Sequence, residues 1–308
     1  MHRFLVRLGF LTLLAGSTFP LGGCLFRTRP VQRRVSDAPL KTSSQQELIQ
    51  YLNTQAAAIR SLQATVDINA SVADESKVTD FSEIRGYVLA RKPSMLRLKG
   101  LMPLVRNTAF DMVSDGAHFK LWIPTKNKFV VGANNVETAQ PKQKLENLRP
   151  QHIYDALLLP EIGADHIAVL ENGYETVLDS KKHPVDQPDY ELAVIEKGPN
   201  GWFLSRKIEF SRNDLLPHRQ QIYDQEGNVV TDAHYLEYKD YSGTQFPSNI
   251  QIERPREGYD IALSIVKLDL NKPLTDDKFV LEQPPGAAVV HLDQPSDPHE
   301  QKGSDGHK

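Results

Sequence analysis

The sequence predicts a mainly β fold, built as an antiparallel meander with a few helices. Short runs in which apolar and polar residues alternate recur between Thr65 and Leu270, and this period of two is typical of strands with one dry face. Pro, Gly and Asp-Gly signals separate the runs, as in a meander. Two segments, 44–62 and 145–159, have apolar residues at helical spacing instead. With 40 % hydrophobic residues in 308 positions, a sizeable core is possible.

The N-terminus has the features of a secretory signal. Arg3 and Arg7 precede an apolar run from Leu8 to Phe19, which suits a signal peptide and is too short to span a bilayer. The run is followed by Leu21, Gly22, Gly23 and Cys24, and Cys24 is the only cysteine. This stretch resembles the lipobox of bacterial lipoproteins. An ordinary signal with an incidental cysteine is the alternative, but position, spacing and uniqueness together favour Cys24 as an anchor.

The lipobox resemblance has three implications. Signal peptidase II would remove residues 1–23, and the sulfur of Cys24 would carry a diacylglycerol. Because each buried methylene contributes about 0.8 kcal/mol, two or three acyl chains would hold the body firmly on a membrane. Leu25 stands where enterobacterial lipoproteins kept at the inner membrane typically carry Asp, which implies the outer membrane and a periplasm-facing body. No free thiol would remain for a disulfide or a metal site.

Residues 24–42 are interpreted as the lipid anchor and a basic linker. The linker contains Pro30, Pro39 and four arginines, which are Arg27, Arg29, Arg33 and Arg34. Basic residues beside an anchor are attracted to anionic headgroups, whereas a solvated spacer is the alternative of equal weight. The formal net charge of −3 gives no reason to expect nucleic-acid binding.

A helix is expected to follow the linker, because Ser44 and Glu47 have the spacing of a capping box. An apolar stripe continues at steps of three and four through Leu48, Leu52, Ala56, Ile59 and Leu62. We expect the stripe to pack on a sheet. A position on the membrane surface is the weaker alternative, because the opposite face is rich in Gln and not in Lys.

The expected strands fall into two series. The first comprises 65–72, 84–91, 95–99, 109–113, 119–123 and 129–131. A helix is expected within 145–159, with Pro150 in its first turn and Pro160 as its stop. The second series comprises 166–170, 174–178, 190–195, 202–210, 219–223, 229–238, 250–253 and 261–270. Asn172-Gly173 predicts a hairpin turn, 179–188 a polar loop, and 284–308 a disordered polar tail, which leaves 43–283 as the body.

Several segments of this body resemble the lipoprotein-localisation superfamily of the LolA and LolB type. They are 86–93 (GYVLARKP), 96–98 (LRL) followed by Pro103-Leu104, 114–116 (SDG), 121–124 (LWIP), 223–227 (YDQEG) and 245–250 (QFPSNI). The resemblance covers roughly residues 44–282 and is strongest to uncharacterised outer-membrane lipoproteins of this fold. Extra length around 164–188 and the His-bearing tail depart from the LolB pattern.

The resemblance implies an unclosed, strongly curved antiparallel barrel, or half-barrel, whose concave face is covered by helices around an apolar cavity. Members of the superfamily carry acyl chains there or hand lipoproteins to the outer membrane. The candidate lining residues are Val88, Leu96, Leu98, Phe110, Met112, Leu121, Ile252 and Leu263. The alternative for each is ordinary core packing, because strand alternation does not distinguish a core from a cavity.

One loop is singled out as a candidate membrane contact. Leu101, Met102, Leu104 and Val105 form an apolar run around Pro103, between two expected strands. The LolB type exposes a hydrophobic loop here that is thought to touch the bilayer, and such a run is unusual if solvated. Burial of the loop against a helix is the alternative.

No catalytic pattern stands out. The ten histidines form no His-Glu-x-x-His, and neither a Gly-x-Ser-x-Gly elbow nor a phosphate-binding Gly-rich loop occurs. His291, His299 and His307 are too widely spaced for a compact metal site. We therefore expect no enzyme, metal or cofactor. Two functions remain open: a carrier of lipid or lipoprotein acyl chains, and an envelope scaffold or sensor with a filled core that binds other envelope proteins.

Overall fold

The computed structural model describes residues 34–36, 39–74, 77–103, 105–134 and 149–292. The chain divides into two units, Met1–Arg34 and Val35–Lys308, and the following description concerns the second. The predicted lipobox and Cys24 lie outside the described residues.

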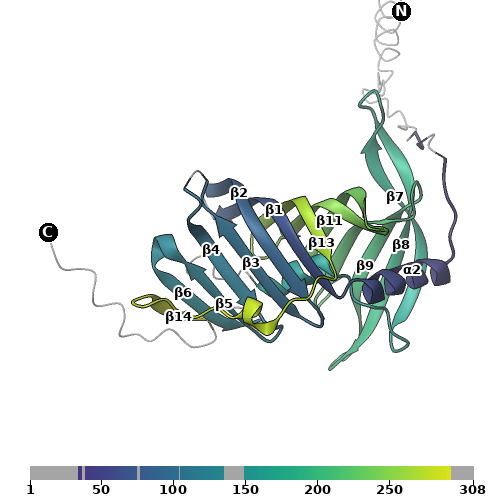
Figure 1. Ribbon diagram of the computed structural model, residues 1–308. Helices are drawn as coiled ribbons and strands as arrows, with labels where there is room; N and C mark the ends of the chain where they lie inside the picture. Colours follow the sequence, from purple (N-terminus) through teal and green to yellow (C-terminus); the bar gives the residue numbers. More distant parts are fainter. Residues whose placement is uncertain (1–33, 37–38, 75–76, 104, 135–148, 293–308) are drawn as a thin grey trace, which may run out of the picture. The chain divides into compact units, whose positions relative to one another are not determined.

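One sheet of 14 strands forms this unit (Figure 1). Its strands are β1 (Ser61–Asp74), β2 (Lys77–Arg91), β3 (Met95–Leu101), β4 (Thr108–Ser114), β5 (His118–Ile123), β6 (Lys128–Ala133), β7 (Ile167–Leu178), β8 (Pro184–Gly198), β9 (Gly201–Ser211), β10 (Pro217–Tyr223), β11 (Val229–Tyr241), β12 (Thr244–Arg254), β13 (Tyr259–Leu270) and β14 (Ala288–His291). Their order in the sheet is β14-β6-β5-β4-β3-β2-β1-β13-β12-β11-β10-β9-β8-β7. Neighbours are antiparallel except β14 and β6, which are parallel. The sheet is curved and its end strands do not pair with each other, so the predicted unclosed, curved and mainly antiparallel sheet is confirmed.

Two helices cover the inner face of the sheet. Helix α2 (Gln45–Ala58) packs Leu48 and Leu52 onto an apolar cluster from β8 and β9. Helix α3 (Pro150–Leu157) lies over a larger cluster from β1–β6 and β11–β13. Alternation along the strands explains the dry inner face, since in β3 every second residue is buried.

The predicted capping box is present at the start of α2. The Ser44 hydroxyl accepts from the Glu47 N–H at 3.3 Å, and the Glu47 carboxylate accepts from the Ser44 N–H at 2.7 Å. The predicted end of this helix was wrong, because Leu62 is buried in β1. Asn271 stops the helix earlier: its side chain donates to the Ala58 carbonyl at 2.7 Å and accepts from the Arg60 N–H at 2.8 Å. Sequence periodicity gives no sign of this distant cap.

The predicted Asn172-Gly173 turn was wrong. Strand β7 runs straight through it, because β8 pairs with β7 along its whole length, with Asn172 opposite Tyr190. The chain reverses further on, where the Asp179 carboxylate accepts from the N–H groups of Lys181 and His183, both at 2.8 Å. The predicted polar loop 179–188 is therefore shorter, since β8 begins at Pro184.

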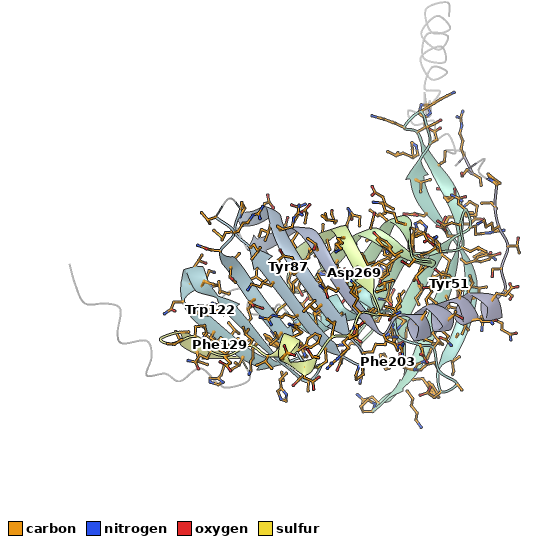
Figure 2. All side chains as sticks on the ribbon, in the orientation of Figure 1. Tyr51, Tyr87, Trp122, Phe129, Phe203 and Asp269 are labelled. Carbon is orange, nitrogen blue, oxygen red and sulfur yellow. The ribbon has the colours of Figure 1, made fainter. Side chains whose placement is uncertain are left out.

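The C-terminal segment crosses the outer face of the sheet. It includes the short helix η3 (Asp276–Phe279), beside which Arg97 donates to the Lys278 carbonyl at 2.9 Å. Leu281 and Ala287 are then buried with Val113, Phe129 and Trp122, the last two labelled in Figure 2. The prediction of disorder from residue 284 is wrong for residues 288–291. These residues form β14, whose two adjacent valines pair with the edge of β6. Residues 293–308 lie outside the described residues.

Candidate functional site

The eight candidate lining residues lie together on the inner face of the sheet. Phe110 is partly buried, and the other seven are at most 3 % exposed. They share one cluster with Ile153, Tyr154 and Leu157 of α3. The seven candidates inside the cluster are Val88, Leu96, Leu98, Met112, Leu121, Ile252 and Leu263, and Phe110 packs against it. As described, their side chains fill the space between the sheet and α3.

Helix α3 is held on the sheet by its apolar side and by hydrogen bonds at both of its flanks, one of them from Gln220 of β10 to the Asp155 carbonyl at 3.2 Å. Pro150 occupies the first turn, as predicted, and its missing N–H costs nothing there. Ile153 is fully buried. The Tyr154 hydroxyl donates to the Pro93 carbonyl at 2.7 Å, which ties the helix to the turn between β2 and β3.

An apolar pocket of about 50 Å³ lies where α2 and the end of α3 approach β10–β12. Its lining contains none of the eight candidates and comprises Tyr51, Leu52, Gln55, Ala56, Ile59, Lys92, Ala156, Leu157, Leu158, Leu159, Pro217, Tyr235, Tyr238, Gln245, Phe246 and Pro247. Ligand pockets usually measure roughly 300–1,000 Å³. In this conformation the pocket is too small for an acyl chain.

The surroundings of this pocket are dry. Burial, together with the charge of Asp214, raises the pKa of Tyr51 (labelled in Figure 2) to about 12. Burial also lowers the pKa of Lys92, whose ammonium donates to the Ala56 carbonyl near the end of α2. The Lys92 ammonium thus satisfies a backbone carbonyl at the C-terminal end of α2, beside the pocket.

The second side of α3 meets a buried polar cluster, which we call the α3 polar cluster and define as Gln151, His152, Asp155, Arg206, Gln220, Arg254, Glu257 and Tyr259. Arg254, 1 % exposed, donates to Thr231 at 2.7 Å and to Glu257 at 2.5 Å. Arg206 donates to Gln220 at 3.2 Å, and Gln151 to Asp155 at 2.8 Å. Burial raises the pKa of Asp155. Burial and the charges of Arg254 and Arg149 hold the pKa of His152 well below its usual range.

Five polar atoms of the α3 polar cluster have no hydrogen-bond partner among the described residues. They are Gln151 Oε1, His152 Nδ1, Arg254 Nε, Glu257 Oε2 and Tyr259 Oη. Sequence reasoning missed this cluster, although one signal was available. Arg254 shares a strand face with Ile250 and Ile252, so alternation already places a cation on the buried side of β12.

The candidate membrane-contact loop connects β3 and β4. Leu101 is the last, partly buried residue of β3, and Leu104 lies outside the described residues. Met102 and Val105 are 37 % and 65 % exposed, so these two side chains are not buried against a helix. The loop is closed by the Met102 N–H donating to Asn107 at 2.7 Å and the Arg106 N–H donating to Met102 at 3.1 Å.

Neither a metal centre nor a spanning helix is found in the part of the chain that the structure describes. No group of three or more His, Cys, Asp or Glu side chains is placed there to hold a metal ion. His291 is exposed in β14, while His299 and His307 lie outside the described residues. None of the described helices is long and apolar enough to cross a membrane.

No family model and no curated protein match the chain. Among solved structures, it is similar to a DUF1329 family protein from Desulfovibrio piger, with 16 % identity over 76 % of this chain and 95 % of that one and a TM-score of 0.48. For a LolA superfamily protein from Nitrosomonas europaea, the identity is 15 % over 76 % of this chain and 97 % of that one, with a TM-score of 0.45. For a domain described as an outer membrane lipoprotein-sorting protein domain, from Vibrio parahaemolyticus, the identity is 13 % over 76 % of this chain and 94 % of that one, with a TM-score of 0.49. All three likenesses concern the fold alone.

Proposed function

We propose that the protein is a non-enzymatic lipoprotein of the outer membrane, anchored through Cys24 and facing the periplasm, that binds acyl chains of lipids or lipoproteins. The binding site is the inner face of the sheet beneath α2 and α3. The observation that carries the proposal is the apolar pocket between these two helices, which joins the clusters that each helix covers.

A chain longer than a few carbons needs more room than about 50 Å³, so binding requires α3 to move away from the sheet. Two features support such a movement. The helix has only 8 residues. In addition, the α3 polar cluster buries polar and charged groups against this helix, and such groups are better solvated when water reaches them. Water reaching these groups would offset part of the apolar contact that α3 loses.

The loop between β3 and β4 supports a membrane-facing role. Met102 and Val105 present apolar surface at its tip, and Leu101 and Leu104 belong to the same run. We propose that these four residues contact the bilayer during lipid transfer.

An envelope scaffold or sensor with a filled core is the second candidate function. Two observations favour it: the pocket measures only about 50 Å³, and the eight predicted lining residues pack together elsewhere, beneath α3.

Neighbouring alanines of α2 allow a test that separates the two functions. Ala56 lines the pocket and is buried, whereas Ala57 is exposed. In the full chain with Cys24→Ser, purified without detergent, Ala56→Phe should fill the pocket and weaken binding of a fluorescent fatty acid, with Ala57→Phe as the matched control. Native mass spectrometry of the same protein reports co-purified lipid. A lipid-free protein that binds no fatty acid in any variant would rule out the carrier and leave the scaffold.

A further inference from the structure

Strand β7 ends the sheet with an edge that no described strand covers (Figure 1). Its 12 residues pair with β8 over their whole length without a register shift. The opposite end of the sheet is different, because its last strand, β14, has only 4 residues. A short edge strand is one way in which proteins avoid unwanted strand pairing, and β7 lacks this protection.

The sequence of β7 also lacks three residue types that often protect an edge. It contains no Pro, Lys or Arg, which are the residues that commonly block an edge strand. Several large apolar side chains are exposed along it. They are Ile167 at 46 %, Val169 at 41 %, Tyr174 at 66 % and Leu178 at 67 %. Within the described ranges, the Gln45 side chain of α2 occupies this edge only at the Ala168 carbonyl. A long edge with exposed apolar side chains beyond that point is a template for an added strand.

Acidic residues set the charge of this edge. Glu171, Glu191 and Glu209 stand directly opposite one another across β7, β8 and β9. Lys207 pairs with Glu191 at 2.6 Å and Arg219 with Glu209 at 3.2 Å. Among the described residues no ion pair reaches Glu171, the end of this row. Like charges on opposite strand positions are destabilising, so the row lacks a cation on its open side.

The excess of acidic over basic side chains extends towards the C-terminal end of β7. Glu175 is also without a described ion pair, and it lies near Asp189 of β8. Burial, with a further contribution from the charge of Glu175, raises the pKa of Asp189 to about 6. Two cations four residues apart on an added strand would face Glu171 and Glu175 together, since alternate residues share one side of a sheet.

We propose that β7 is the docking edge for an extended, basic segment of another protein, which adds to the sheet as an antiparallel strand. Lys or Arg of that segment lies opposite Glu171 and Glu175, and apolar residues lie opposite Tyr174 and Leu178. A second copy of this chain suits the edge less well, because its own β7 brings the same acids and no cation. The inference is independent of lipid binding.

Backbone direction identifies a variant that blocks the edge. The Ala168 carbonyl accepts from the Gln45 side chain of α2 at 3.1 Å, so it points away from β8. In an antiparallel pair, residues two apart point their backbone groups the same way. Tyr174 therefore directs its N–H outward, and Tyr174→Pro removes a donor from the edge without taking one from β8.

The probe is a labelled peptide, Val-Thr-Thr-Lys-Ile-Thr-Thr-Lys-Val, that places its lysines opposite Glu175 and Glu171. Its control carries Glu in place of both Lys. Fluorescence anisotropy with the full chain, Cys24→Ser, should show binding about tenfold tighter for the lysine peptide. Tyr174→Pro should abolish binding at an unchanged circular dichroism spectrum, and the double variant Glu171→Gln, Glu175→Gln should remove the preference for lysine.

Three results would overturn the proposal. One is equal binding of both peptides, and another is binding that Tyr174→Pro leaves intact. The third is a dimer of the chain alone, detected by light scattering, that Tyr174→Pro dissociates, since the occupant of the edge would then be a second copy. Loss of fatty-acid binding in the pocket variant Ala56→Phe has no bearing on any of these readouts.

Discussion

Removing the carboxylate of Glu257 is expected to destabilise the protein strongly. Its partner Arg254 lies 2.5 Å away, and their side chains are only 10 % and 1 % exposed. Glu257→Gln keeps the shape of the side chain but leaves the guanidinium buried without a counter-charge in direct contact. Breaking such a pair on one side costs roughly 3–5 kcal/mol of unfolding free energy.

This cost can be measured as a shift in melting temperature. For a body of this size, each kcal/mol lowers Tm by roughly 2–4 °C, so Glu257→Gln should lower it by roughly 6–20 °C. The assay is thermal unfolding of the full chain with Cys24→Ser, followed by circular dichroism. The matched control is Asp67→Asn, which breaks the Arg85–Asp67 pair at 2.6 Å with side chains 49 % and 39 % exposed. That exposed pair should be worth about 1 kcal/mol or less.

A double variant tests the reason for the loss. In Arg254→Met with Glu257→Gln the unpaired charge is gone, and an apolar side chain of similar length takes its place. Replacement of a buried pair by apolar residues is often close to neutral, so the double variant should recover most of the lost Tm. If Glu257→Gln melts like Asp67→Asn, or if the double variant is no better than Glu257→Gln, the charge-burial argument is wrong.

Three further predictions concern the anchor, the loop and pH. Cys24→Ser should abolish labelling by an alkyne analogue of palmitate and move the protein from the membrane to the soluble fraction; retention in the membrane would contradict the anchor. Leu104→Glu or Val105→Glu should reduce sedimentation of the protein with anionic vesicles. The control Trp202→Glu, at a side chain 54 % exposed on β9, should not, and equal losses in all variants would exclude a specific contact of the loop. The pKa of Asp189 is raised from about 3.8 to about 6 in the folded protein. The folded state therefore binds this proton more tightly than the unfolded state, and the protein loses this contribution to its stability as the pH rises from about 4 to about 6. Asp189→Asn should therefore flatten the Tm profile in that window, and an unchanged profile would refute the assignment.

Local signals in the sequence predicted local structure well. The Ser44 and Glu47 capping box and Pro150 in the first turn of α3 need only neighbouring residues, and both are present. Predictions failed where a distant partner decides. The Asn172-Gly173 signal favours a turn, but hydrogen bonds along the whole of β8 outweigh it.

The candidate site divides in the same way. Alternation placed Leu96, Leu98 and the other candidates on the inner face, where they are buried. It gave no information on volume, because the space above that face depends on how closely α3 approaches. The α3 polar cluster draws its residues from α3, β9, β10 and the β12–β13 hairpin, so its assembly depends on sheet order, which alternation alone does not supply.

Strand β1 has a consequence for how the protein is made. One edge of β1 pairs with β2, which follows it directly in the chain. Its other edge pairs with β13, far along the sequence, where Ile261 lies opposite Ala70. Contacts so far apart in sequence form slowly. The first half of the molecule therefore remains an incompletely paired meander, with exposed apolar surface, until the last strands have been synthesised. A prematurely terminated product lacking β13 is an expected substrate for chaperones and proteases.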